Sequence, residues 1–252
     1  MNDLMKAVTE NLIFVAEFLG IVVLMFAIAY IYEKWSMKKN AGKGRLFSTR
    51  KVSMIGMFSA IAVILMLLEF PLFFAPGFYK LDFSEIPVLI GAFAFGPMTG
   101  VAIEFCKILL ELILKGTTTA FVGELANFII GCSFILPASI IYSHKKSKKT
   151  ALIGSVTGTV CMTIFGTAFN AIYLLPKFAQ LYGMPLDAIV EMGTVVNPAI
   201  NSVTTMVIFA VAPLNILKGA SVSAITVLIY KKLSPILKEG HRKPEIRKAE
   251  KN

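Results

Sequence analysis

Long apolar segments separated by short basic runs constrain this chain more than any other feature of its sequence. Residues 12–32 form one such segment, and several more lie between residues 52 and 230. A helix needs about 20 predominantly apolar residues to cross a bilayer. Only 16% of the 252 residues are charged, whereas soluble domains contain about 25%. The sequence therefore predicts an all-α integral membrane protein that spans the bilayer several times.

The positive charge of the chain is concentrated in a few places. Its 25 lysines and arginines contribute to a formal net charge of +10, and most of them fall within residues 34–51, 145–149 and 231–252. Basic loops of membrane proteins stay on the cytoplasmic side. These runs lack the interleaved aromatic residues that stack on bases. The charge therefore indicates topology and affinity for anionic lipid, and no nucleic-acid partner.

The same pattern divides the chain into four parts. Residues 1–33 contain an extra N-terminal transmembrane helix, which ends in a basic stretch and so has the opposite polarity to a cleaved signal peptide. Residues 34–51 form a basic cytoplasmic linker, residues 52–233 a six-helix core, and residues 234–252 a basic, disordered tail. We expect the N-terminus outside the cell and the C-terminus in the cytoplasm.

Prolines and glycines place the turns of the predicted core. Pro71 and Pro76 keep residues 69–85 in a non-helical outer loop, and Gly96-Pro97 marks a turn after a short inward segment. The stretch 195–230 is too long for one span, and two spans would put the basic tail outside. We therefore expect one span from Pro213 to Lys232, with residues 195–212 packed on the outer side of the bundle.

A polar pair in the last predicted helix is the first candidate for ligand binding. Asn215 and Lys218 are three residues apart, so they share one helix face near the outer surface. An amide beside an ammonium suits a polar heterocycle with carbonyl oxygens and ring nitrogens. The alternative is a lysine that extends to the interface with water.

Further polar residues lie within apolar segments, where each needs a partner or a function. Glu104 and Glu111 flank Lys107 at helical spacing, which favours an internal charge-neutralising ladder over ligand contact. Glu124 and Asn127 form another pair at the outer end of their helix. Asn170 lies deep in an apolar run, either at the ligand or in an interhelical hydrogen bond.

Two other features have a functional and a structural interpretation. The outer loop, with Tyr79, Asp82 and several phenylalanines, either closes over an aromatic ligand or forms an interfacial aromatic belt. Gly56, Ser59 and Ala60 give one helix a smooth face. That face packs either on an inner helix or on a partner protein.

The sequence lacks the residues that several other classes of function require. The sequence contains no GxxxxGK[ST] motif, so it has no P-loop for ATP hydrolysis. Its three cysteines stand apart from one another, and both histidines adjoin basic runs, which argues against a metal site. We find no nucleophile–base pair within the bilayer, which disfavours an intramembrane enzyme. We expect no metal and no bound cofactor.

Six strings in the core together carry a family resemblance. They are SAIAVIL, KLDFSEIP, FAFGPMTG, GELANFIIG, FNAIYLLP and APLNILKG, and they occur in this order within the predicted core, residues 52–233. The chain resembles the substrate-binding S components of energy-coupling-factor (ECF) vitamin transporters, in particular the riboflavin-specific ones. The resemblance implies a six-helix core that binds riboflavin near its outer face in a bacterial cell membrane.

The resemblance also implies ligand-binding residues. Asn215, Lys218 and Asn170 match the family's polar positions, and the further candidates are Glu124, Asn127, Leu81, Asp82 and Tyr79. Other flavins, such as flavin mononucleotide (FMN) or roseoflavin, and other vitamins stay open as ligands. Only two lysines, Lys80 and Lys177, lie in the predicted outer loops, which weighs against a phosphate-bearing flavin.

The implied partners are a transmembrane coupling protein and two ATPase subunits. The implied docking residues are Gly56, Ser59 and Ala60, where Gly56-x-x-x-Ala60 replaces a strict Ala-x-x-x-Ala. The helix at residues 12–32 departs from the family pattern. A secondary carrier that works without ATPases and a structural subunit without a ligand remain alternatives.

Overall fold

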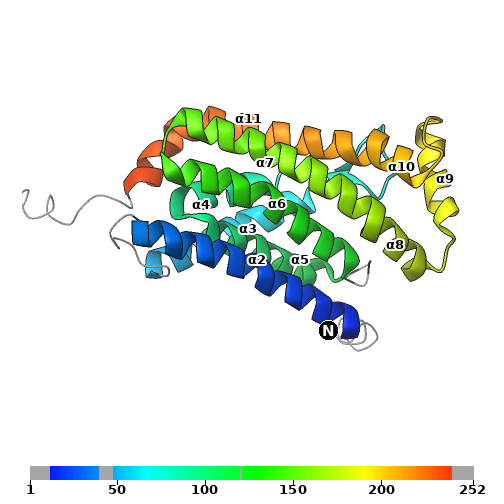
Figure 1. Ribbon diagram of the computed structural model, residues 1–252, viewed down its shortest axis with the longest axis horizontal. Coiled ribbons are helices and arrows are strands. Elements are labelled where there is room, and N and C mark those ends of the chain that lie inside the picture. The colour runs from blue at the N-terminus through cyan, green and yellow to red at the C-terminus, as the bar shows by residue number, and fades with distance from the viewer. Residues whose placement is uncertain (1–11, 40–47, 118, 120, 240–252) are drawn as a thin grey trace, which may run out of the picture.

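The computed structural model describes residues 12–39, 48–117, 119 and 121–239, and it shows an elongated bundle of helices (Figure 1). The helices are α2 (Leu12–Lys39), α3 (Thr49–Leu67), α4 (Glu85–Phe95), α5 (Pro97–Lys115), α6 (Val122–His144), α7 (Lys148–Phe169), α8 (Leu175–Tyr182), α9 (Leu186–Val196), α10 (Val203–Met206) and α11 (Ala212–Glu239). Two π-helical turns, η1 (Asn170–Leu174) and η2 (Val207–Val211), join α7 to α8 and α10 to α11. Five helical stretches in the described chain are long and apolar enough to cross a membrane, which confirms the all-α membrane class.

The short helix α4 lies at the centre of the bundle. It contacts α3, α5, α6 and α11, and nearly all of its side chains are buried. An element that is apolar on every side is stable only when protein or lipid surrounds it completely. Gly96, with φ of 105°, makes the turn that was expected at Gly96-Pro97, and Pro97 begins α5.

Glycines bring α6 and α7 into close contact. A Cβ added at Gly154 would lie 2.5 Å from the carbonyl oxygen of Ala138, and one at Gly158 would lie 2.5 Å from that of Phe134. Small residues allow the backbones of membrane helices to approach in this way. This close packing holds α7, and the π-helical turn η1 that continues from it, against α6.

Helix α2 packs on α5 and α6 as an integral part of the bundle. Phe18, Val22 and Ala29 are buried on that face. At the other end of α2, the Glu33 carboxylate accepts hydrogen bonds from the Met98 backbone N–H at 3.2 Å and from Lys51 at 2.8 Å. The helix runs to Lys39, so residues 34–39 are helical and do not belong to the linker that we expected at 34–51.

The last helix differs from its expected bounds. It begins at Val203, where Ser202 and Thr205 form a capping box, and it continues through η2 into α11 without a break before Pro213. Pro213 has no N–H to donate, and the widened turn of η2 directly precedes it. Residues 203–212 therefore belong to this helix and are not a separate outer segment. Residues 234–239, expected in the tail, are also helical, whereas 1–11, 40–47 and 240–252 lie outside the described residues.

Candidate ligand-binding site

A cavity of about 530 Å³ opens at one end of the bundle. We call this the loop end, because it carries the segment Leu68–Ser84 that connects α3 to α4. Within this segment, β1 (Phe70–Pro71) and β2 (Lys80–Leu81) pair as a short antiparallel hairpin. Side chains from the loop, α5, α6, η1, α8, α9 and α11 line the cavity. Its volume falls within the range of about 300–1,000 Å³ that is typical of small-molecule sites.

Lys218 joins α11 to the loop. Its ammonium lies 2.8 Å from Asp82 Oδ2 and 3.9 Å from Glu85 Oε1, while Asp82 Oδ1 accepts from the backbone N–H of Ser84 at 2.8 Å. Burial favours the neutral form of Asp82, but the ammonium groups of Lys218 and Lys107 outweigh it and lower the pKa of Asp82 to about 2. Lys218 is therefore a mostly buried, paired residue in the cavity wall.

Asn215 presents an amide that the protein leaves without a partner. Its side chain is 3% exposed and lines the cavity, and its Nδ2 has no hydrogen-bond acceptor among the described residues. An unsatisfied buried donor costs about 1–3 kcal/mol. The amide nitrogen is thus available to a ligand acceptor in the cavity.

Asn170 on η1 is held by the protein on both sides of its amide. Its Nδ2 donates to the carbonyl oxygen of Gly166 at 2.8 Å, and its Oδ1 accepts from the Tyr79 hydroxyl at 2.8 Å. Burial raises the pKa of Tyr79 above its usual value, so the hydroxyl stays protonated as a donor. Through these two hydrogen bonds Asn170 links the loop to α7, and it also lines the cavity.

The wall formed by α5 and α6 carries carboxylates. Glu124 lines the cavity and its Oε2 accepts from the Thr119 hydroxyl at 2.9 Å, while Asn127 lies on the same wall. Glu111 lines it as well. At the mouth, Glu69 Oε1 bridges Lys80 and Lys115, each at 2.7 Å.

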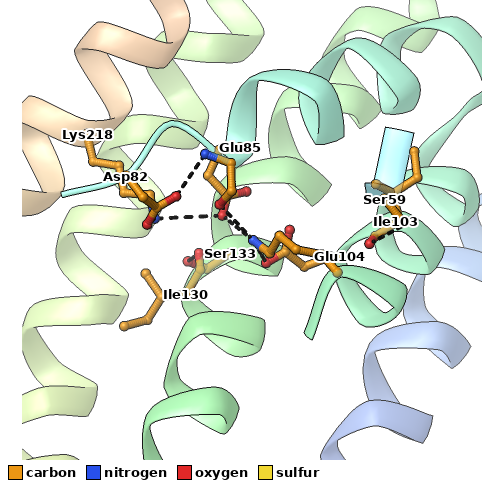
Figure 2. A network of polar contacts seen from close by, with 10 residues as sticks. Ser59, Asp82, Glu85, Ile103, Glu104, Ile130, Ser133 and Lys218 are labelled. Carbon is orange, nitrogen blue, oxygen red and sulfur yellow. Dashed lines mark hydrogen bonds and ion pairs between the residues drawn. The ribbon is translucent and has the colours of Figure 1, made fainter. Parts of the chain in front are cut away.

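A buried charge network lies behind the cavity. The Lys107 ammonium lies 2.6 Å from Glu104 Oε1 and 2.9 Å from Glu85 Oε1. Figure 2 shows Lys218, Asp82 and Glu85 directed toward one another, with the contacts continuing to Glu104. Of the expected ladder, the pair of Lys107 with Glu104 is formed. Among the described residues, the second carboxylate that pairs with Lys107 is Glu85 of α4 and not Glu111, which lines the cavity.

Two predicted sites need correction. Leu81 is buried, but it is not among the residues that line the cavity. Ser59 is fully buried and donates to the carbonyl oxygen of Ile103 at 3.3 Å, so it packs on α5 and is not part of an open docking face. Gly56 and Ala60 are exposed on α3.

Several lining residues were missed at the level of sequence. They include Glu85 and Lys115, and the residues Phe178, Tyr182, Met184, Ile189 and Met192 of the α8–α9 segment. Glu111 was named, but the ladder was favoured over ligand contact. The two π-helical turns that flank the cavity were missed too, although such turns frequently mark functional sites. Within the described residues, no cluster of three or more His, Cys, Asp or Glu side chains is arranged to hold a metal ion.

The model of one protein family, the ECF transporter substrate-specific component, matches residues 50–230. The chain belongs to this family. It is therefore a membrane-embedded transporter subunit, an S component, and not an enzyme. The match begins in the first turn of α3, so α2 lies outside the part of this S component that the family model covers.

Individual relatives agree with this membership. The S component is 32% identical to a riboflavin transporter FmnP of Bacillus subtilis, over 75% of this chain and 95% of the relative. It is 35% identical to a riboflavin transporter RibU of Staphylococcus aureus, over 75% and 93%. Among solved structures, it matches the S component of a bacterial ECF transporter with a TM-score of 0.58 and 34% identity, over 75% of this chain and 98% of that one.

Proposed function

We propose that this S component binds riboflavin in the cavity at the loop end and delivers it to an ECF module for uptake. The observation that carries the proposal is Asn215, a buried amide whose Nδ2 has no partner among the described residues and which lines a cavity of about 530 Å³ beside Lys218. Relatives that cover three quarters of the chain are named riboflavin transporters. The sequence and the geometry therefore favour the same ligand class.

The chemistry of the wall suits a flavin ring. Asn215 offers an amide donor and acceptor, and Lys218 is a donor already oriented by Asp82. These groups complement the carbonyl oxygens and ring nitrogens at the polar edge of isoalloxazine. Aromatic and methionine side chains from the loop, α8 and α9 provide apolar surface for the faces of the ring.

The remaining predicted residues take supporting roles in this proposal. Asn170 has a second lone pair on Oδ1, so it accepts from Tyr79 and is still able to accept from the ligand. Glu124 and Asn127 face the ligand from α6. Leu81 acts through the hairpin, where it pairs with Phe70, and holds the loop that carries Asp82.

We also propose the orientation and the partners. Residues that adjoin the basic segments meet at one end of the bundle, where Lys51 pairs with Glu33 and Tyr32 contacts His144. Helices α8, α9 and α10 lie at the other end (Figure 1), and residues of α8 and α9 line the cavity. The positive-inside rule then places the end near the basic segments in the cytoplasm of a bacterial cell and the loop end outside. The exposed Gly56 and Ala60 on α3 suit close packing on a transmembrane coupling protein that is driven by two ATPase subunits.

The test is a titration of the purified full-length chain in detergent, following quenching of riboflavin fluorescence. We expect saturation at one riboflavin per chain, and a loss of affinity of about 10-fold in Asn215→Ala, equivalent to about 1.4 kcal/mol. Ile216→Ala is the matched control, because Ile216 is the next residue of α11 and is 51% exposed. It should bind as the wild type does.

Two outcomes would contradict the proposal. A wild-type chain that does not bind riboflavin but binds another vitamin would keep the transporter class and replace the ligand. Riboflavin uptake by vesicles that contain this chain alone, without an ATPase module, would favour a secondary carrier.

A further inference from the structure

Two carboxylates from neighbouring helices line one wall of the cavity. Glu111 of α5 is 8% exposed and Glu124 of α6 is 7% exposed, and both line the cavity. Neither belongs to an ion pair in the described parts of the chain.

The ammonium groups that line the cavity are already engaged. Lys80 and Lys115 share Glu69, and Lys218 is paired with Asp82. The lining contains five carboxylates, namely Glu69, Asp82, Glu85, Glu111 and Glu124. The charge that remains for a ligand on the α5–α6 wall is therefore negative.

The hydrogen bonds around the two carboxylates differ. The Thr119 hydroxyl accepts a hydrogen bond from the backbone N–H of Gly123 at 3.0 Å and donates one to Glu124 Oε2 at 2.9 Å. Glu111 Oε2 is buried and has no hydrogen-bond partner among the described residues. A buried carboxylate oxygen without a donor is costly, so a ligand that brings a donor to Glu111 is favoured here.

Hydroxyl groups meet that requirement, and phosphate does not. An ionised carboxylate only accepts hydrogen bonds, and its bonds from O–H donors are short and strong. A phosphate monoester carries about −1.5 to −2 charges at neutral pH, which these two carboxylates would repel. We propose that Glu111 and Glu124 form a polyol subsite that binds the hydroxyl groups of the ligand's sugar-alcohol chain and rejects a phosphorylated chain.

This inference rests on the proposed function and deepens it. Asn215 and Lys218 line the same cavity as Glu111 and Glu124, so a flavin ring held by the first pair leaves the ribityl chain to the second. The subsite thus selects riboflavin over two other flavins: lumiflavin, which has a methyl group in place of the chain, and FMN, which has a phosphate at the end of it.

The experiment measures the affinities of the full-length chain for riboflavin, lumiflavin and FMN. The wild type should bind riboflavin about 10-fold more tightly than either of the others. Glu111→Gln, which keeps the size of the side chain and removes its charge, should lower the affinity for riboflavin about 10-fold and leave that for lumiflavin unchanged. Glu111→Gln should also reduce the ratio of the affinity for riboflavin to the affinity for FMN. Glu191→Gln is the matched control, because Glu191 is exposed on α9 outside the lining, and it should change none of the three.

The outcomes separate this inference from the proposed function. Retained lumiflavin binding in Glu111→Gln shows that the variant is folded. An unchanged ratio of riboflavin to lumiflavin affinity in Glu111→Gln and in Glu124→Gln would overturn the subsite, and the assignment of riboflavin would stand. A wild-type chain that binds none of the three flavins would overturn both.

Discussion

Gly166 of α7 lies directly against Asn215 of α11, so that a methyl group added at Gly166 would lie 2.7 Å from the amide nitrogen. The same glycine accepts a hydrogen bond from Asn170 through its carbonyl oxygen. One residue without a side chain therefore positions two of the asparagines that we assign to the ligand. This contact links the packing of α7 and α11 to the geometry of the site.

Gly166→Ala should displace the Asn215 side chain and weaken riboflavin binding about 10-fold, or about 1.4 kcal/mol. The fold should survive, because the atom that must move is the end of a side chain. Fluorescence titration in detergent measures the riboflavin affinity, and thermal unfolding in detergent tests whether the fold survives. Gly20→Ala is the control, since nothing lies within 4 Å of the added methyl group. Equal affinities for the two variants would show that Gly166 does not position Asn215.

The pair between Lys218 and Asp82 should make the loop sensitive to acid. The pKa of Asp82 is lowered from its usual 3.8 to about 2, so its ionised form stabilises the folded state. That contribution is fully present above about pH 4 and is lost as the pH falls toward 2. The difference in melting temperature between the wild type and Asp82→Asn should therefore be constant from pH 7 to about pH 4 and shrink below it. A difference that does not change with pH would contradict this pairing.

The part of the site that could be predicted from sequence lies on single helices. Asn215 and Lys218 are close in the chain, so helical spacing alone placed them together. Glu85 as the partner of Lys107 comes from another helix, and no local pattern indicates it. The sequence therefore indicates which polar residues of the apolar segments need a partner, but not which residue that partner is.

The errors in the fold have physical reasons of their own. Membrane helices are apolar toward both lipid and protein, so the face of α3 on which Ser59 is buried could not be told from its open face. Pro213 indicated a helix start, but η2 accommodates it within a longer helix. The capping box of Ser202 and Thr205 was a local signal for the true start at Val203, and it was overlooked.

Lys107→Met should destabilise the protein strongly. Lys107 is 1% exposed and pairs with Glu85 and Glu104, which are 2% and 0% exposed. Removing the ammonium leaves both carboxylates buried without it, at a cost of about 3–5 kcal/mol. Thermal unfolding should show a large loss, and the double variant Lys107→Met with Glu104→Gln should recover part of it. A single variant as stable as the wild type would mean that the network does not stabilise the bundle.

Glu33 should anchor α2 without affecting the ligand. Its carboxylate is buried and accepts from the first turn of α5, at the Met98 N–H, and from Lys51 at the start of α3. A negative charge at a helix N-terminus is also favourable. Glu33→Ala leaves the Met98 N–H without its acceptor and should lower stability by about 1–3 kcal/mol.

Riboflavin affinity at low temperature should stay the same in Glu33→Ala, because Glu33 lies at the end of the bundle opposite the cavity. Lys38→Ala, at an exposed position on the same helix, is the control and should melt as the wild type does. If Glu33→Ala also melts like the wild type, α2 is held by its apolar face alone. If it weakens riboflavin binding as much as it lowers stability, the two ends of the bundle are coupled through α5, which carries Met98 at one end and Glu111 near the other.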